Sequence, residues 1–141
     1  AGLPGLRGKV SDRAILRAMH FFEENERVPR LAAALREPTA EHYLEEMLAS
    51  GESSMEKLQN IYPADPNERG LALALSLCRR ELIGCGGWRV HGGGFAGTVQ
   101  ALVPREREAG FLRVMRETFG EESCTHLTVR AVGACELEFP E

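Results

Sequence analysis

The stretch from Gly84 to Pro104 constrains this chain more than any other, because it holds seven of the fifteen glycines. Four of them fall in the segment GGGFAG, residues 92–97, which lies between two segments that alternate in the manner of β-strands. Glycine costs about 0.5–1 kcal/mol inside a regular element, so this density indicates a tight turn or a backbone that approaches a bound group. We expect a wide β-hairpin with strands over residues 88–91 and 98–103.

The same glycines allow the loop to bind a ligand. A backbone without Cβ atoms can turn successive N–H groups toward one point, which suits phosphate or sugar oxygens. The spacing matches neither the G-x-G-x-x-G motif of a dinucleotide fold nor the G-x-x-x-x-G-K-[ST] motif of a P-loop. A glycine-rich hairpin without any ligand is therefore the alternative to a binding loop.

The composition is that of an ordinary globular domain. The 141 residues are enough for one domain with a real core, and 43% are hydrophobic and 27% charged. A net charge of −4 with mixed signs argues against a general nucleic-acid surface, which needs a basic patch. No apolar run approaches the ~20 residues of a membrane span, so we expect no membrane role.

The four cysteines, Cys78, Cys85, Cys124 and Cys135, show no C-x-x-C pairing and no clustered histidines. We therefore expect reduced thiols and no metal site, as in a cytoplasmic protein. The chain begins AGLPGLRG, with neither a methionine nor a signal peptide, and we expect it to be a fragment or a processed product. The sequence does not indicate an oligomeric state.

Residues 1–10 are expected to form a linker or an incomplete first strand, and residues 11–141 a single domain. Helical spacing begins after Ser11 or Asp12, either of which suits an N-cap, and continues to about Glu26. Its apolar residues include Phe22, and the acidic residues Glu23, Glu24 and Glu26 are interpreted as a solvated face. Pro29 is expected to sit in the first turn of a continuing helix that ends before Pro38.

The rest of the chain alternates helices and strands. Thr39 is expected to cap a helix that runs toward Tyr62 and is interrupted by a kink or close approach at residues 49–54. Residues 71–78 are apolar nearly all round and predict a central buried helix, followed after the hairpin by a helix over 106–119 and a last strand over 126–132. This order predicts an α+β fold with an antiparallel sheet covered by helices.

Residues 87–98, GWRVHGGGFAGT, resemble the third motif of the galactokinases, which belong to the GHMP family of small-molecule kinases. The family pattern is usually written GARMTGGGFGG, and this chain departs from it at Trp88, Val90, His91 and Ala96. Three other segments resemble galactokinases in the same order: MHFFEENERV (19–28) resembles RHVVSENERV, MLASGESSM (47–55) resembles LMNESHESL with Ser54 in register, and 127–134 resembles the closing strand.

The resemblance covers nearly the whole chain but only the carboxy-terminal half of such a kinase. It implies a ferredoxin-like GHMP carboxy-terminal domain. It also implies an ATP- and Mg²⁺-dependent kinase that phosphorylates galactose or a related sugar. The amino-terminal domain would supply the serine-rich phosphate loop, the catalytic aspartate and its arginine, so the isolated chain is expected to bind no cofactor and to be inactive.

The resemblance places one group of residues near the sugar and the terminal phosphate, in a loop that would contribute mainly steric clearance: Gly92, Gly93, Gly94, Phe95, Ala96 and Gly97. No catalytic residue and no metal ligand is expected in this part of the kinase. His91 could donate to a phosphate or face solvent. Arg89 could lie near anionic ligand groups, although we favour a structural pairing with a carboxylate.

A different class of function is also consistent with the sequence. The chain could be a non-catalytic α+β module that uses the glycine loop to bind a small ligand or a partner. A phosphate loop of the Gly-Leu-Ser-Ser-Ser type encoded upstream of the chain would favour the kinase.

Overall fold

The fold is α+β, as the sequence predicts. The structure is a computed structural model that describes residues 3–95, 97–129, 132, 133 and 135. Its elements, in chain order, are α1 (Leu3–Leu6), α2 (Asp12–Ala34), α3 (Glu41–Ser53), the π-helix η1 (Ser54–Leu58), α4 (Gly70–Leu82), β1 (Gly87–Val90), β2 (Val99–Leu102), α5 (Arg105–Phe119) and the 3₁₀ turn η2 (Glu121–Ser123).

Helix α2 begins where the sequence predicts. The Oγ atom of Ser11 accepts a hydrogen bond from the backbone N–H of Ala14 at 3.2 Å, which satisfies one of the free donors of the first turn. The predicted end of this helix at about Glu26 is wrong, because one helix continues through Pro29 to Ala34. An interior proline costs about 3 kcal/mol, and here α2 packs against α3, which stabilises the longer helix. Phe22, one of the apolar residues that give this helix its spacing, is 65% exposed.

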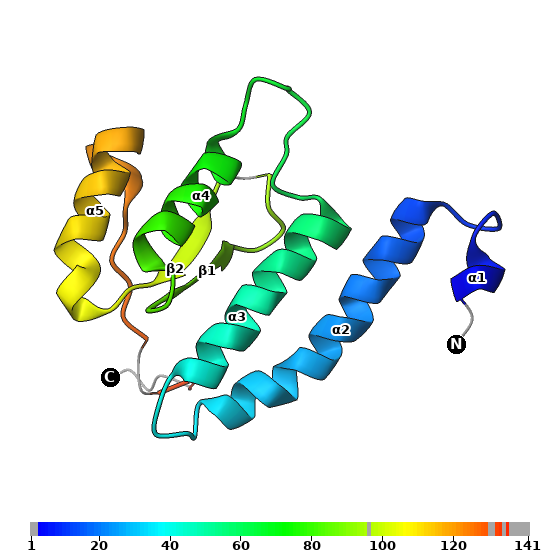
Figure 1. Cartoon of the computed structure of the whole chain (residues 1–141), viewed down its shortest axis with the longest axis horizontal. Helices are drawn as coiled ribbons and strands as arrows, with labels where there is room; N and C mark the ends of the chain where they lie inside the picture. Colours follow the sequence, from blue (N-terminus) through cyan, green and yellow to red (C-terminus); the bar gives the residue numbers. More distant parts are fainter. Residues whose placement is uncertain (1–2, 96, 130–131, 134, 136–141) are drawn as a thin grey trace, which may run out of the picture.

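Helix α3 and η1 form the second arm of an antiparallel helical pair with α2 (Figure 1). The prediction of Thr39 as N-cap is wrong, because Ala40 holds that position without a side-chain hydrogen bond. The close approach predicted at residues 49–54 is confirmed at Gly51. A Cβ atom on Gly51 would lie 3.1 Å from the Arg89 Cβ and 3.2 Å from the Trp88 carbonyl oxygen. Glycine therefore lets α3 lie directly on β1.

The hairpin lies between two groups of helices. Strands β1 and β2 pair antiparallel, from Gly87 opposite Leu102 to Val90 opposite Val99, close to the predicted bounds. A Cβ on Gly87 would meet Leu44 and Met47 of α3, whereas Trp88 packs on a cluster from α4 and α5. Alternate residues of β1 thus face α3 on one side and α4 on the other, as period-two side-chain direction requires.

Helix α4 is central but is covered on one face only. Its buried residues recur with helical spacing at Leu71, Ala74, Cys78 and Leu82, while Leu73 is 47% exposed. The prediction of a helix buried nearly all round is therefore too strong. Two clusters form its core contacts, one with Phe111 and Met115 of α5 and the other with Ile61 and Val90.

The predicted strand over 126–132 is wrong for its described part. Residues 124–129 form no strand, and Leu127 and Val129 are 82% and 94% exposed; residues 130 and 131 lie outside the described residues. The Nδ1 atom of His126 lies 2.8 Å from the Glu108 carboxylate, so the segment is tied to α5 rather than to an edge of the sheet (Figure 1). The alternation of apolar residues therefore produces no strand here, although β2 pairs only with β1 among the described residues.

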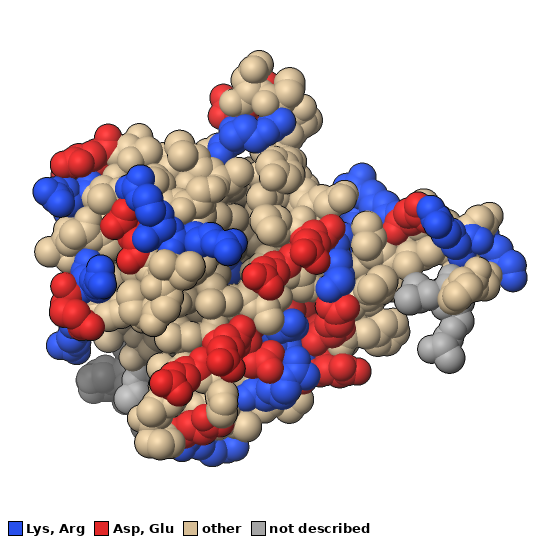
Figure 2. Space-filling model, viewed as in Figure 1, with Lys and Arg blue, Asp and Glu red and all other residues tan. Residues whose placement is uncertain are grey.

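Two surface properties complete the description. Among the described helices none is both long enough and apolar enough to cross a bilayer. Figure 2 shows acidic side chains gathered over α2 and α3, with basic side chains between them, on the face in view.

Candidate functional site

The glycine loop connects β1 to β2 and has an unusual backbone. Three of its glycines have positive φ, 63° at Gly92, 73° at Gly94 and 83° at Gly97, and Phe95 has a φ of 53°. Ala96 lies outside the described residues. A non-glycine residue in the left-handed region costs about 1–2 kcal/mol, and such strain gathers at functional loops. The Phe95 side chain is 54% exposed, so its own packing does not account for the strain.

Gly93 and Gly94 have different reasons to be glycine. A Cβ on Gly94 would overlap the backbone carbonyl oxygen of Asn60 and lie 2.8 Å from its side chain, and its φ is positive. Gly93 has no positive φ, is exposed, and would meet no atom within 4 Å. Nothing within the described residues therefore requires glycine at position 93, whereas position 94 requires it twice.

His91 and Arg89, the two side chains that the sequence places beside the loop, are separated by the structure. His91 is exposed and its backbone N–H donates to the Thr98 carbonyl at 3.0 Å, which extends the strand ladder into the loop. Arg89 is turned toward α3: its guanidinium donates to the Ser50 Oγ at 2.6 Å and lies 4.0 Å from the Glu24 carboxylate. The structural pairing expected for Arg89 is confirmed.

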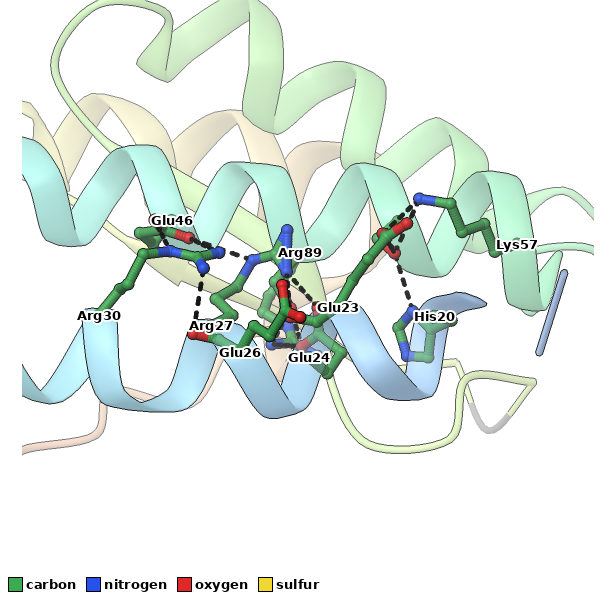
Figure 3. Close-up of polar contacts among 11 residues, drawn as sticks. His20, Glu23, Glu24, Glu26, Arg27, Arg30, Glu46, Lys57 and Arg89 are labelled. Carbon is green, nitrogen blue, oxygen red and sulfur yellow. Dashed lines mark hydrogen bonds and ion pairs between the residues drawn. The ribbon is translucent and has the colours of Figure 1, made fainter. Parts of the chain in front are cut away.

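Arg89 joins a polar network between α2 and α3, shown in Figure 3. Ser50 donates to the Glu24 carboxylate at 2.6 Å, and Lys57 donates to the Glu23 carboxylate at 2.5 Å. The interpretation of the acidic run as a solvated face is therefore wrong for Glu23 and Glu24. These carboxylates point toward α3, because α3 and η1 supply hydroxyl and ammonium donors that the sequence of α2 does not reveal.

The buried part of this network is centred on Arg27, whose side chain is 8% exposed. Its guanidinium donates to the Glu24 carboxylate at 2.8 Å and lies 3.3 Å from the Glu46 carboxylate. Arg30 also binds the Glu46 carboxylate, at 2.5 Å. Shared carboxylates lower the cost of burying Arg27, since each charge keeps opposite charges nearby. The network fixes the two helices relative to each other and to β1.

His20 lies at one end of the network, and its pKa is lowered, first by burial. Its Nδ1 atom lies 3.0 Å from the Ser53 Oγ. The carboxylates of Glu23 and Glu24 raise its pKa and the cations of Arg89 and Lys57 lower it, so that burial decides the direction.

We expect the stability of the chain to fall as the pH drops below about 6.5. A lowered pKa means that the unfolded chain binds the proton more readily, so the contribution of His20 is present above 6.5 and is lost toward its folded pKa. Urea unfolding between pH 5 and pH 8 should show a shallower pH dependence in His20→Gln. His42→Gln is the matched control, because Glu37 raises the pKa of His42 and its contribution is lost as the pH rises. Equal slopes in the native and His20→Gln chains would contradict this expectation.

A groove of about 340 Å³ lies between α3, α4 and β1. Its lining is mainly apolar and includes Met55, Ile61, Leu75 and Trp88, and Arg79 adds a basic group. The sequence does not predict this groove, because its lining residues come from segments that are far apart along the chain. It is separate from the glycine loop, although Ile61 directly follows the residue that contacts Gly94.

The four cysteines are free, as expected. Burial raises the pKa of the Cys78 thiol to about 12, which makes this side chain an inert part of the core. Within the part of the chain that the structure describes, no three His, Cys, Asp or Glu side chains gather closely enough to hold a metal ion. No protein-family model, curated protein or solved structure matches the chain.

Proposed function

We propose that this chain is the carboxy-terminal domain of a galactokinase-like sugar kinase with a ferredoxin-like GHMP architecture. Its glycine loop would contribute to an active site shared with an amino-terminal domain. The observation that carries the proposal is Gly93, a glycine whose φ and surroundings within the described residues do not require glycine. Clearance for a bound group is a physical reason for omitting a side chain there.

The backbone of the loop has hydrogen-bonding capacity for such a group. Among the described residues, the N–H groups of Gly93 and Gly94 donate to no other part of the chain. Backbone N–H groups in a loop of mixed-hand conformation suit phosphate and hydroxyl oxygens. Transfer of a phosphoryl group depends on positioning and on electrostatic stabilisation, and this loop offers positioning.

ATP and Mg²⁺ would be held mainly by the amino-terminal domain. The loop carries neither a carboxylate nor a lysine, so it fits the sugar and the terminal phosphate better than it fits a metal ion. When bound, Mg²⁺ would neutralise phosphate charge. The residues of this chain would position the acceptor sugar and exclude water from it.

We expect the complete kinase, in which the proposed amino-terminal domain is joined to this chain, to release ADP in the presence of ATP and galactose or a related hexose. Gly93→Ala should lower kcat/KM at least tenfold, about 1.4 kcal/mol, because the new methyl group occupies the clearance. Gly110→Ala, in an open position on α5, is the matched control and should keep full activity. The measurement is a coupled ADP-release assay over a panel of hexoses, with melting curves for each variant.

Two results would contradict the proposal. One is the absence of turnover with every hexose in the complete protein. The other is robust turnover by the 141-residue chain alone, which would place the whole active site within it. A non-catalytic module is the second candidate, and the apolar groove that Trp88 lines favours it, because such grooves bind small ligands.

A further inference from the structure

Asn60 lies beneath the glycine loop and contacts it from two directions. It is 2% exposed. Its backbone carbonyl accepts a hydrogen bond from the Phe95 N–H at 3.0 Å, and its side-chain Nδ2 donates to the Gly93 carbonyl at 3.3 Å. One residue thus binds both sides of Gly94.

The close contact between Asn60 and the glycine loop depends on the local backbone geometry of both segments. Gln59 ends η1 in the left-handed region, with a φ of 55°, and so turns the chain out of the helix just before Asn60. On the other side, Gly94 packs on Asn60 so closely that a Cβ would overlap its carbonyl oxygen. Two uncommon backbone conformations are therefore used to bring these residues together.

Stabilisation of the fold does not account for an asparagine side chain at position 60. Its Oδ1 atom is buried and forms no hydrogen bond within the described residues. A buried acceptor without a partner costs about 1–3 kcal/mol, and such groups are uncommon in native proteins. The bond from Nδ2 to Gly93 fixes the amide orientation, and burial of Oδ1 follows from it.

We propose that Asn60 is the positioning residue of the glycine loop. It holds Gly93 and Phe95 in one arrangement, and it turns the Gly93 carbonyl and the Phe95 N–H inward. This leaves the N–H groups of Gly93 and Gly94 for a ligand oxygen. The ligand part of this inference rests on the proposed function, whereas the control of loop conformation does not.

The test is Asn60→Asp, which keeps the shape of the side chain and removes the donor. At neutral pH a carboxylate oxygen would face the Gly93 carbonyl and repel it, so the loop should detach. In acid the protonated carboxyl can donate again, and the loop should return. We expect the protection of the Phe95 amide against hydrogen exchange to fall at least tenfold at pH 7 and to recover at low pH.

The controls separate loop position from general unfolding. Asn25→Asp makes the same change at an exposed site on α2 and should leave Phe95 protection unchanged. The native chain, measured over the same pH range, gives the pH dependence that does not come from position 60. Protection of the Cys78 amide, which lies in the middle of α4 in the core, reports on global unfolding. Asn60→Ser, which keeps a shorter donor, replaces the aspartate variant if that variant does not fold.

Two outcomes bear on the proposal in different ways. Native Phe95 protection at pH 7 in folded Asn60→Asp, or in folded Asn60→Ser where that variant replaces it, would overturn it. In the complete protein we expect Asn60→Asp to lower kcat with a smaller change in KM for ATP. A detached loop with unchanged turnover would support the role of Asn60 in the loop and contradict the proposed function of the loop.

Discussion

Gly94→Ala is expected to destabilise the chain by at least about 2 kcal/mol. The added Cβ would require a left-handed alanine, at about 1–2 kcal/mol, and would overlap the Asn60 carbonyl, for which overpacking costs about 1–3 kcal/mol. Gly93→Ala is the matched control one residue away. With no positive φ and open space, it should leave stability unchanged or raise it by about 0.4–1 kcal/mol.

Urea unfolding followed by far-UV circular dichroism measures both variants. The pair separates the two reasons for a glycine, backbone geometry and clearance for a ligand. If both alanines destabilise the chain equally, Gly93 serves the turn as well. In that case the observation that carries the proposed function is lost.

The elements of this fold follow from its sequence to a large extent. Ser11 identifies the start of α2, Gly120 the end of α5, and the alternation around residues 92–97 the two strands, because each signal is local. Pro29 is a local signal that misleads. Contacts between α2 and α3 outweigh its cost, and those contacts depend on residues distant in the sequence.

The site could be predicted only in part. The density of glycines predicts the loop, and the positive charge of Arg89 predicts that it pairs with a carboxylate. Asn60 carries no such signal, since one polar residue in a segment that also contains Gln59 is not unusual. Its role depends on a contact across 33 positions of sequence, which periodicity and motif matching do not register.

The acidic run on α2 illustrates the same limit. Helical periodicity predicts the relative directions of the Glu23, Glu24 and Glu26 side chains around the helix axis. It does not predict which groups each side chain faces. The hydroxyls and cation that Glu23 and Glu24 bind lie on α3, η1 and β1. The charge of a side chain on α2 therefore predicts its solvent exposure less well than the position of the neighbouring helix does.

Leu82→Ala is expected to cost about 2–5 kcal/mol, a large share of the ~5–15 kcal/mol that stabilises a typical domain. Leu82 is fully buried where α4 meets α5, in a cluster with Phe111 and Met115, and its removal leaves a cavity beside the hairpin. Leu73→Ala makes the same change on the exposed face of the same helix, so helix propensity cancels in the comparison. Urea midpoints should fall sharply for Leu82→Ala and change little for Leu73→Ala. Similar losses in the two variants would mean that α4 is buried all round, as its sequence predicts, and that its outer face is covered.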